Sequence, residues 1–115
     1  MTVPSLLLSR TMASSTPDER YKLIFFAPPQ SLPDIKTAIF AAGAGSYPGK
    51  GSYTECCFTM PGVGQFRPGS STNPAIGTLG KLEEVGEVRC ETICVGHSVT
   101  RAAVEALKKH VSCQV

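Results

Sequence analysis

The first part of the chain carries a continuous apolar run that predicts a buried strand. Residues 21–28 are almost all apolar and end at consecutive prolines, a pattern typical of a strand with two apolar faces. Leu23 and Phe25 share one face of this strand. Ile24 and Phe26 share the other, so we expect a central strand of a sheet that is covered on both sides.

Apolar residues at helical spacing predict a helix directly after this strand. They are Leu32, Ile35, Ile39 and Ala42. We expect Ser31 to be the N-cap of the helix. Gly43 is expected to end it, because glycine adopts the left-handed conformation of a helix C-terminus without steric cost.

A segment rich in glycine and proline separates this helix from the second half of the chain. Residues 43–80 hold most of the 11 glycines. Within this segment, residues 53–60 alternate well enough to predict a strand. Residues 62–80 are expected to form a long loop or an irregular hairpin, and loops of this length in a compact domain usually have a function.

A long strand over residues 81–95 and a helix over residues 99–110 are predicted next. One face of the strand carries Val88, Cys90, Thr92 and Cys94. Gly86 is expected to mark a bulge, and Ser98 is expected to cap the helix. The buried stripe of that helix is expected to be Val99, Ala103, Ala106 and Leu107.

The predicted order β-α-β-β-α indicates an α+β protein with a ferredoxin-like split βαβ fold. We expect an antiparallel sheet with two helices on one face and a last strand that is short or missing. The other face of the sheet carries Ile24, Phe26, Ile93 and Val95. One domain has nothing left to cover these side chains, so we expect another subunit to cover them.

Length and charge limit the functional classes. The chain has 115 residues and a formal net charge of +2, which fits one small domain and leaves no electrostatic footprint for nucleic acid or an anionic membrane. No apolar run approaches the roughly 20 residues of a membrane-spanning helix. We expect a domain over residues 21–110 and a short tail over residues 111–115. Residues 1–20 are expected to be a disordered tail or a weak mitochondrial targeting segment.

The 5 cysteines are expected to be thiols, because no export signal precedes them. They favour a cytoplasmic location, with the mitochondrion as the alternative. Cys90 and Cys94 lie about 13 Å apart on one strand face, too far for one zinc ion. Cys56 and Cys90 are expected to face each other as small buried hydrophobes. We therefore expect no metal and no cofactor. One alternative stays open, a metal held between subunits by His97, His110 or Cys113.

Two short motifs resemble catalytic or nucleotide-binding signatures but fail in detail. Residues 43–51 are rich in glycine, yet they match neither phosphate-loop nor dinucleotide spacing and follow a helix instead of a strand. Residues 96–100 lie at a strand-to-helix turn like a nucleophile elbow, but Thr100 stands where its final glycine should be. We expect no catalytic residue and no enzyme activity.

Residues 62–68, Gly-Val-Gly-Gln-Phe-Arg-Pro, form the most specific string in the sequence. Phe66 can fill a pocket, and Arg67 offers a planar fork for a carboxylate or a phosphate. The alternative, which we favour, is an oligomer contact in which Arg67 pairs with a glutamate, since arginine and aromatic residues are common interface anchors. The possible partners of Arg67 in such a contact are Glu83, Glu87 and Glu91.

Three motifs together resemble a known family. They are Tyr53-x-x-Cys56-x-Phe58-x-x-Pro61-Gly62-x-Gly64-Gln65-Phe66-Arg67-Pro68, then Asn73-Pro74-x-Ile76-Gly77-x-x-Gly80, then Leu82-Glu83-x-Val85-x-Glu87-Val88-Arg89-x-Glu91. Over about residues 21–110 the chain resembles a stand-alone form of the PII/CutA-like domain of YqfO-type, Nif-three-like proteins. The resemblance implies a ferredoxin-like fold related to trimeric PII signalling proteins and CutA. Family members continue with a His-Pro-Tyr-Glu-Glu-like turn and a last strand, and residues 110–115 do not match that pattern.

On this resemblance we expect a non-enzymatic PII/CutA-like domain that works as a homo-oligomer, with a trimer favoured. The resemblance implies a role in sensing a small anionic ligand or in protein interaction. The alternative is a divalent metal-binding protein of the CutA type. The residues expected to bind the ligand or form the interface are Gly62, Gly64, Gln65, Phe66, Arg67, Pro68, Asn73 and Gly77.

Overall fold

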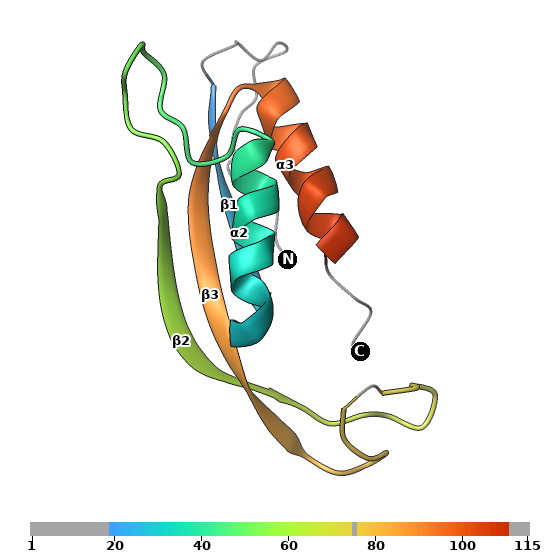
Figure 1. Cartoon of the computed structure of the whole chain (residues 1–115). Coiled ribbons are helices and arrows are strands. Elements are labelled where there is room, and N and C mark those ends of the chain that lie inside the picture. The colour runs from blue at the N-terminus through green and yellow to red at the C-terminus, as the bar shows by residue number, and fades with distance from the viewer. Residues whose placement is uncertain (1–18, 75, 111–115) are drawn as a thin grey trace.

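The computed structural model describes residues 19–74 and 76–110. In chain order the elements are β1 (Arg20–Ala27), the short 3-10 turn η1 (Pro29–Ser31), α2 (Leu32–Ala41), β2 (Cys57–Phe66), β3 (Glu83–Val95) and α3 (His97–His110) (Figure 1). Residues 1–18 of the predicted N-terminal tail or targeting segment and residues 111–115, where the last strand is expected to be short or missing, lie outside the described residues. The predicted tail is one residue too long, because Arg20 already belongs to β1.

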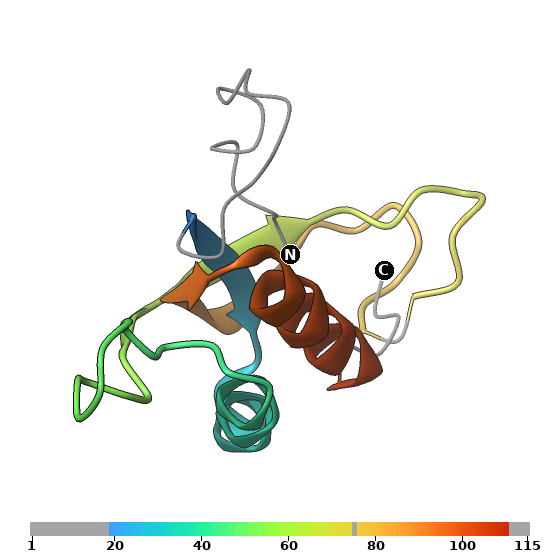
Figure 2. The same ribbon diagram turned by 90° about the horizontal axis from the view of Figure 1, so that it is seen from above.

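The strands form one antiparallel sheet in the order β1-β3-β2. Both helices pack on the same face of this sheet (Figure 1, Figure 2). The predicted α+β class is therefore confirmed, and the element order is compatible with a ferredoxin-like split βαβ fold. Within the described ranges β1 pairs with β3 alone, so the prediction of a central strand is wrong and β1 lies at an edge of the sheet.

The core lies between the helices and the inward faces of the strands. Its buried hydrophobic side chains are Tyr21, Leu23, Phe25, Ala27, Leu32, Ile35, Ile39, Ala44, Val88, Cys90, Cys94, Ala103 and Leu107. The predicted inward faces of residues 21–27 and 88–94 and the predicted stripe of α3 are thus confirmed, with Val99 and Ala106 packed against the core. Neither helix in the described ranges combines the length and the apolar character needed to cross a bilayer.

Gly43 ends α2 as the sequence predicts. It has a φ of +109°, and its N–H donates to the carbonyl of Phe40 at 3.0 Å. The N–H of Ala44 donates to the carbonyl of Ile39, also at 3.0 Å. This pair of hydrogen bonds is the Schellman motif, which satisfies carbonyls that the last helical turn leaves free.

Of the two predicted serine caps, one is confirmed in position and one is wrong. Ser31 is the N-cap residue of α2, but it has helical dihedral angles and its side chain makes no capping hydrogen bond. Ser98 lies inside the first turn of α3, which begins at His97. There the N–H and the hydroxyl of Thr100 both donate to the carbonyl of Gly96, at 3.1 and 2.8 Å.

The sequence misplaces β2 and predicts a bulge that does not form. β2 begins at Cys57 and runs through Phe66, so the first part of the predicted loop is strand. An edge strand tolerates Pro61, because its missing N–H needs no ladder partner on the free side. Pairing with β3 continues without interruption from Cys57 opposite Thr92 to Phe66 opposite Glu83, and Gly86 therefore marks no bulge.

The far halves of β2 and β3 form a two-stranded ribbon that projects beyond the helices (Figure 1). β1 pairs with residues 88–95 of β3, so residues 83–87 pair with residues 62–66 of β2 alone. We call residues 62–66 and 83–87 the ribbon. The loop at its tip is closed where the N–H of Gly80 donates to the carbonyl of Pro68 at 2.7 Å.

Candidate functional site

The sheet has one face that no helix of the described chain covers. We call it the open face. By strand alternation and register its outward side chains are those of Arg20, Lys22, Ile24, Phe26, Phe58, Met60, Phe66, Glu83, Val85, Glu87, Arg89, Glu91, Ile93 and Val95. The expected apolar positions Ile24, Phe26, Ile93 and Val95 are all among them. Within the described residues the open face is therefore a partly apolar surface without a helix over it.

Large apolar side chains lie exposed at the centre of the open face. Phe26 is 49% exposed, Phe58 is 57% exposed and Met60 is 48% exposed. Phe26 and Met60 flank Arg89 from the two neighbouring strands. Several large exposed apolar side chains on one face are characteristic of an interaction site, whereas single exposed hydrophobic residues are ordinary.

Glu91 is the carboxylate at the centre of the charges on this face. It forms an ion pair with Arg89 on its own strand and with Lys22 across the sheet, with 3.5 Å between Lys22 Nζ and Glu91 Oε1. Desolvation alone would raise the pKa of Glu91. The hydrogen bond and charge of Arg89 and the charge of Lys22 outweigh it and hold the pKa below its ordinary value. Glu91 is therefore an ionised, paired carboxylate and not a proton donor.

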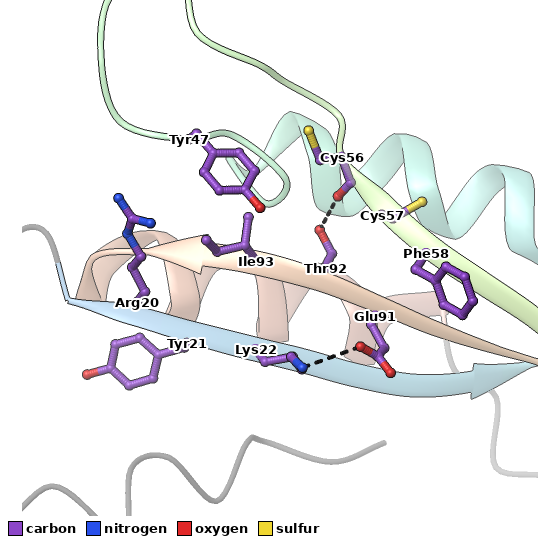
Figure 3. A pocket seen from close by; sticks show the side chains of 10 residues that line it. All are labelled: Arg20, Tyr21, Lys22, Tyr47, Cys56, Cys57, Phe58, Glu91, Thr92 and Ile93. Carbon is purple, nitrogen blue, oxygen red and sulfur yellow. Dashed lines mark hydrogen bonds and ion pairs between the residues drawn. The ribbon is translucent and has the colours of Figure 1, made fainter.

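A hollow of about 400 Å³ opens at one end of the open face. It is lined by Arg20, Tyr21, Lys22, Tyr47, Cys56, Cys57, Phe58, Glu91, Thr92 and Ile93 (Figure 3). The Arg20 guanidinium carbon lies 5.9 Å from the centroid of the Tyr47 ring, within the range of a cation–π contact. The lining is thus mainly apolar, with cations at one side.

The wall that carries Tyr47 is positioned by long-range hydrogen bonds of the segment between α2 and β2. The N–H of Gly45 donates to the carbonyl of Ile93 at 2.7 Å, and the N–H of Cys56 donates to the carbonyl of Gly45 at 3.0 Å. The Thr92 hydroxyl donates to the carbonyl of Cys56 at 2.7 Å. These bonds tie the segment to β3, and the Tyr47 N–H bonded to the Tyr53 carbonyl closes its loop.

The aliphatic hydroxyl and the carboxylate that line the hollow already have partners. Thr92 and Glu91 are the aliphatic hydroxyl and the carboxylate of the hollow, and both are engaged in the bonds described above. Across residues 19–74 and 76–110, no group of three His, Cys, Asp or Glu side chains comes together as a metal site. The metal-binding alternative therefore finds no support, and Cys113 lies outside the described residues.

The sequence-predicted site residues do not line the hollow. Gly62, Gly64, Gln65 and Phe66 lie along the ribbon, Arg67 and Pro68 follow it, and Asn73 and Gly77 lie in the tip loop. Nη1 of Arg67 donates to the carbonyl of Gly80 at 2.8 Å, so this side chain fastens the tip loop. Pro68 is buried, whereas Asn73 is exposed. A ligand or interface role for these residues stays a prediction.

Gly64 and Gly77 have a steric role that the sequence does not reveal. A Cβ atom at Gly64 would overlap the Glu87 carboxylate, which lies across this glycine. A Cβ atom at Gly77 would lie 2.6 Å from Cγ of Glu83, and Gly77 also has a φ of +89°. The two glycines therefore leave room for two glutamate side chains to lie close against the backbone.

Sequence reasoning missed Arg20, Lys22, Tyr47 and Phe58 as candidates. The sequence carries only weak signals for them. Arg20 and Lys22 alternate with buried residues at the start of β1, and Tyr47 lies in a glycine-rich segment. The hollow exists because three separate segments meet. A search for short motifs along one segment cannot find it.

Cys90 and Cys94 are core residues, whereas Cys56 and Cys57 are half-buried, and the predicted pairing of Cys56 with Cys90 is wrong. Cys57 lies opposite Thr92 and thereby shares the inward face with Cys90, so Cys57, not Cys56, is the neighbour of Cys90. The Cys56 thiol instead donates to the carbonyl of Thr54 at 3.6 Å. The cysteines Cys56, Cys57, Cys90 and Cys94 are all free thiols.

The buried thiols predict a loss of stability at alkaline pH. Burial, together with Cys57, raises the pKa of Cys90 from 9.0 to about 12, and burial raises that of Cys94 to about 11. The unfolded chain ionises these thiols near pH 9.0, so the stability they contribute is complete below that pH and is lost as the pH rises toward 11–12. We expect a loss of about 1 kcal/mol per thiol by about pH 10.

Urea denaturation at neutral and alkaline pH measures this effect. The control is Cys94→Ala, which should lower stability at neutral pH but lose less of it at alkaline pH than the wild type. Parallel losses in both proteins would show that other groups cause the alkaline effect.

Comparisons with known proteins point to one group of longer relatives. No family model matches the chain. It is 36% identical over 107 residues to the "GTP cyclohydrolase 1 type 2 homolog" of Bacillus subtilis, covering 91% of this chain and 28% of that protein. The protein of the same name from Halalkalibacterium halodurans is 35% identical over 99 residues, covering 86% of this chain and 26% of that protein.

A solved structure agrees with these relatives. A Bacillus cereus protein related to NIF3 matches with a TM-score of 0.67 at 30% identity, over 90% of this chain and 25% of that chain. The similarity to Nif-three-like proteins is therefore found in sequence and in structure. This chain spans about a quarter of the length of the relatives it matches.

Proposed function

We propose that this chain is an oligomer-forming interaction domain of PII/CutA-like type, and that the open face is its contact surface. The observation that carries the proposal is the exposed apolar centre of a sheet face with no helix over it, formed by Phe26, Phe58 and Met60. Covering this surface would remove apolar area from water, which is the main driving force of association. The resemblance to trimeric PII and CutA proteins favours a trimer.

The proposal assigns no reaction to the chain. The relatives carry the name of a GTP cyclohydrolase homolog, but this chain corresponds to about a quarter of them. The hollow offers an aliphatic hydroxyl and a carboxylate that already have partners. A binding role for this part of such proteins agrees with both facts. The free thiols support a cytoplasmic location.

Light scattering of the wild type and of Phe58→Glu tests the proposed contact surface. We expect the wild type to be oligomeric at micromolar concentration. Phe58→Glu should be monomeric, because association would then bury an unpaired carboxylate beside Glu91. The substitution is expected to leave the fold intact, since Phe58 is 57% exposed.

A matched control is Tyr53→Glu. Tyr53 is another exposed aromatic residue, 78% exposed, but it lies outside the open face. This variant should keep the mass of the wild type. A folded, monomeric wild type would overturn the proposal, and so would a Phe58→Glu variant with an unchanged mass.

A further inference from the structure

Charges on the open face are separated along its length. The strands of the ribbon, residues 62–66 and 83–87, contain three glutamates and no basic residue. Glu83 and Glu87 point outward on the open face, whereas Glu84 points to the opposite face by strand alternation. The ribbon end of the open face is therefore acidic.

The other end of the open face is basic. Arg20 and Lys22 lie there with one carboxylate, that of Glu91, which Arg89 also reaches from its position between Phe26 and Met60. Glu91 already pairs with both Arg89 and Lys22, and Arg20 lies over the Tyr47 ring. Positive charge therefore remains in excess around the hollow. The exposed apolar centre separates this basic end from the acidic ribbon.

The outward glutamates of the ribbon are held in place without a cation. Glu87 lies across Gly64, and Glu83 lies against Gly77. No salt bridge joins Glu83 or Glu87 to a basic side chain in the part of the chain that the structure describes. Two carboxylates that lie close against the backbone have lost part of their rotamer freedom before any partner arrives, which lowers the entropy cost of pairing them.

We infer that the acidic ribbon of one copy of this chain lies against the basic end of the open face of a second copy. Glu83 and Glu87 of one copy then pair with Arg20 and Lys22 of the next, and the apolar centres meet between them. This inference rests on the proposed function, since it needs the open face to self-associate. It adds that the acidic ribbon of one copy contacts the basic end of another. Complementary charges of this kind fix register and suppress wrong orientations.

A second copy fits these observations better than a small anion. An anion in the hollow would neutralise Arg20 and Lys22, but it would leave the exposed Phe26 and Met60 uncovered and the ribbon carboxylates unpaired. Neighbouring copies of the chain supply complements for the acidic end, the basic end and the apolar centre. In a closed ring such as a trimer, each copy presents its ribbon to one neighbour and its basic end to the other.

Charge reversal at each end, followed by reversal at both, tests the pairing. The variants are Glu83→Lys with Glu87→Lys, Arg20→Glu with Lys22→Glu, and the chain with all four substitutions. We expect each double variant to weaken association by about tenfold or more, because like charges then face each other. The fourfold variant should recover most of the wild-type affinity, since its charges are complementary again. A light-scattering dilution series measures the dissociation constants.

Two controls each carry one charge reversal of the same kind elsewhere. Glu84→Lys is on the ribbon but on the opposite face, and Arg101→Glu is on the exposed side of α3. Both should stay within about twofold of the wild-type dissociation constant. If the lysines disturb the ribbon, the neutral pair Glu83→Gln with Glu87→Gln serves instead. It should weaken association and reduce its dependence on salt, because surface charge pairs are screened by ions.

The outcomes separate this inference from the proposed function. If Phe58→Glu is monomeric but the double charge variants associate like the wild type, the pairing is wrong and the open-face proposal stands. Failure of the fourfold variant to recover affinity would also overturn the pairing. A monomeric wild type would remove both proposals.

Discussion

Replacing Phe25 by alanine is expected to lower the free energy of unfolding by about 3–5 kcal/mol, as usual for a large aromatic residue in a core. Phe25 is 0% exposed and lies between the sheet and the helices. Its removal forfeits the apolar burial and leaves a cavity that neighbours such as Ile39 fill only in part. Urea denaturation of Phe25→Ala against the wild type measures the loss.

Phe26→Ala is the matched control, one position along the same strand. Phe26 is 49% exposed and points to the open face. We expect a loss of at most about 1 kcal/mol in dilute solution, and a larger apparent loss at protein concentrations where the wild type is associated. Similar losses for Phe25→Ala and Phe26→Ala at all concentrations would contradict the assignment of the two faces.

Replacing Gly45 by alanine is expected to cost about 3 kcal/mol, since a left-handed residue and a steric overlap add together. Gly45 has a φ of +81°, and a Cβ atom there would lie 2.7 Å from the nitrogen and 2.9 Å from the oxygen of Cys56. These are backbone atoms, so the segment must move as a whole. The hydrogen bond from Gly45 to Ile93, and with it the position of Tyr47, should be disturbed.

Gly51→Ala separates the conformational cost from the overlap. Gly51 has a φ of +74°, but a Cβ atom there would meet no other atom within 4 Å. Only the conformational cost applies there, about 1 kcal/mol. Thermal denaturation of the two variants gives the comparison. Equal losses would mean that the approach of Gly45 to Cys56 has no role in stability.

The sequence predicts those elements whose side-chain pattern reflects burial. Alternation along residues 88–94 identifies the inward face of β3, and Gly43 marks the end of α2 because its conformation needs glycine. β2 is misplaced because Pro61 and the neighbouring glycines normally interrupt strands. Here the strand lies at an edge and its distal half faces solvent, so pairing with β3 is enough to hold it.

The candidate site was predictable in part. The exposed face that carries Ile24, Phe26, Ile93 and Val95 is predictable, because the two predicted helices can cover only one face of the sheet. The hollow does not, because Tyr47 reaches it only through the hydrogen bond between Gly45 and Ile93, whose residues are far apart in sequence. Arg67 makes a contact that the sequence does not predict: its Nη1 donates to the carbonyl of Gly80 in the tip loop.

The ribbon makes β3 a strand of uneven stability. Residues 88–95 have a strand on either side over most of their length and helices over one face, whereas residues 83–87 have a single neighbouring strand. Fraying of the ribbon therefore costs less free energy than opening of the core, although both lie on the same backbone. Residues 88–95 therefore form the more stable end of the open face, and the ribbon is the end that opens first. A partner that binds both ends binds the paired ribbon and not the frayed one, so its binding also suppresses the fraying of this half of β3.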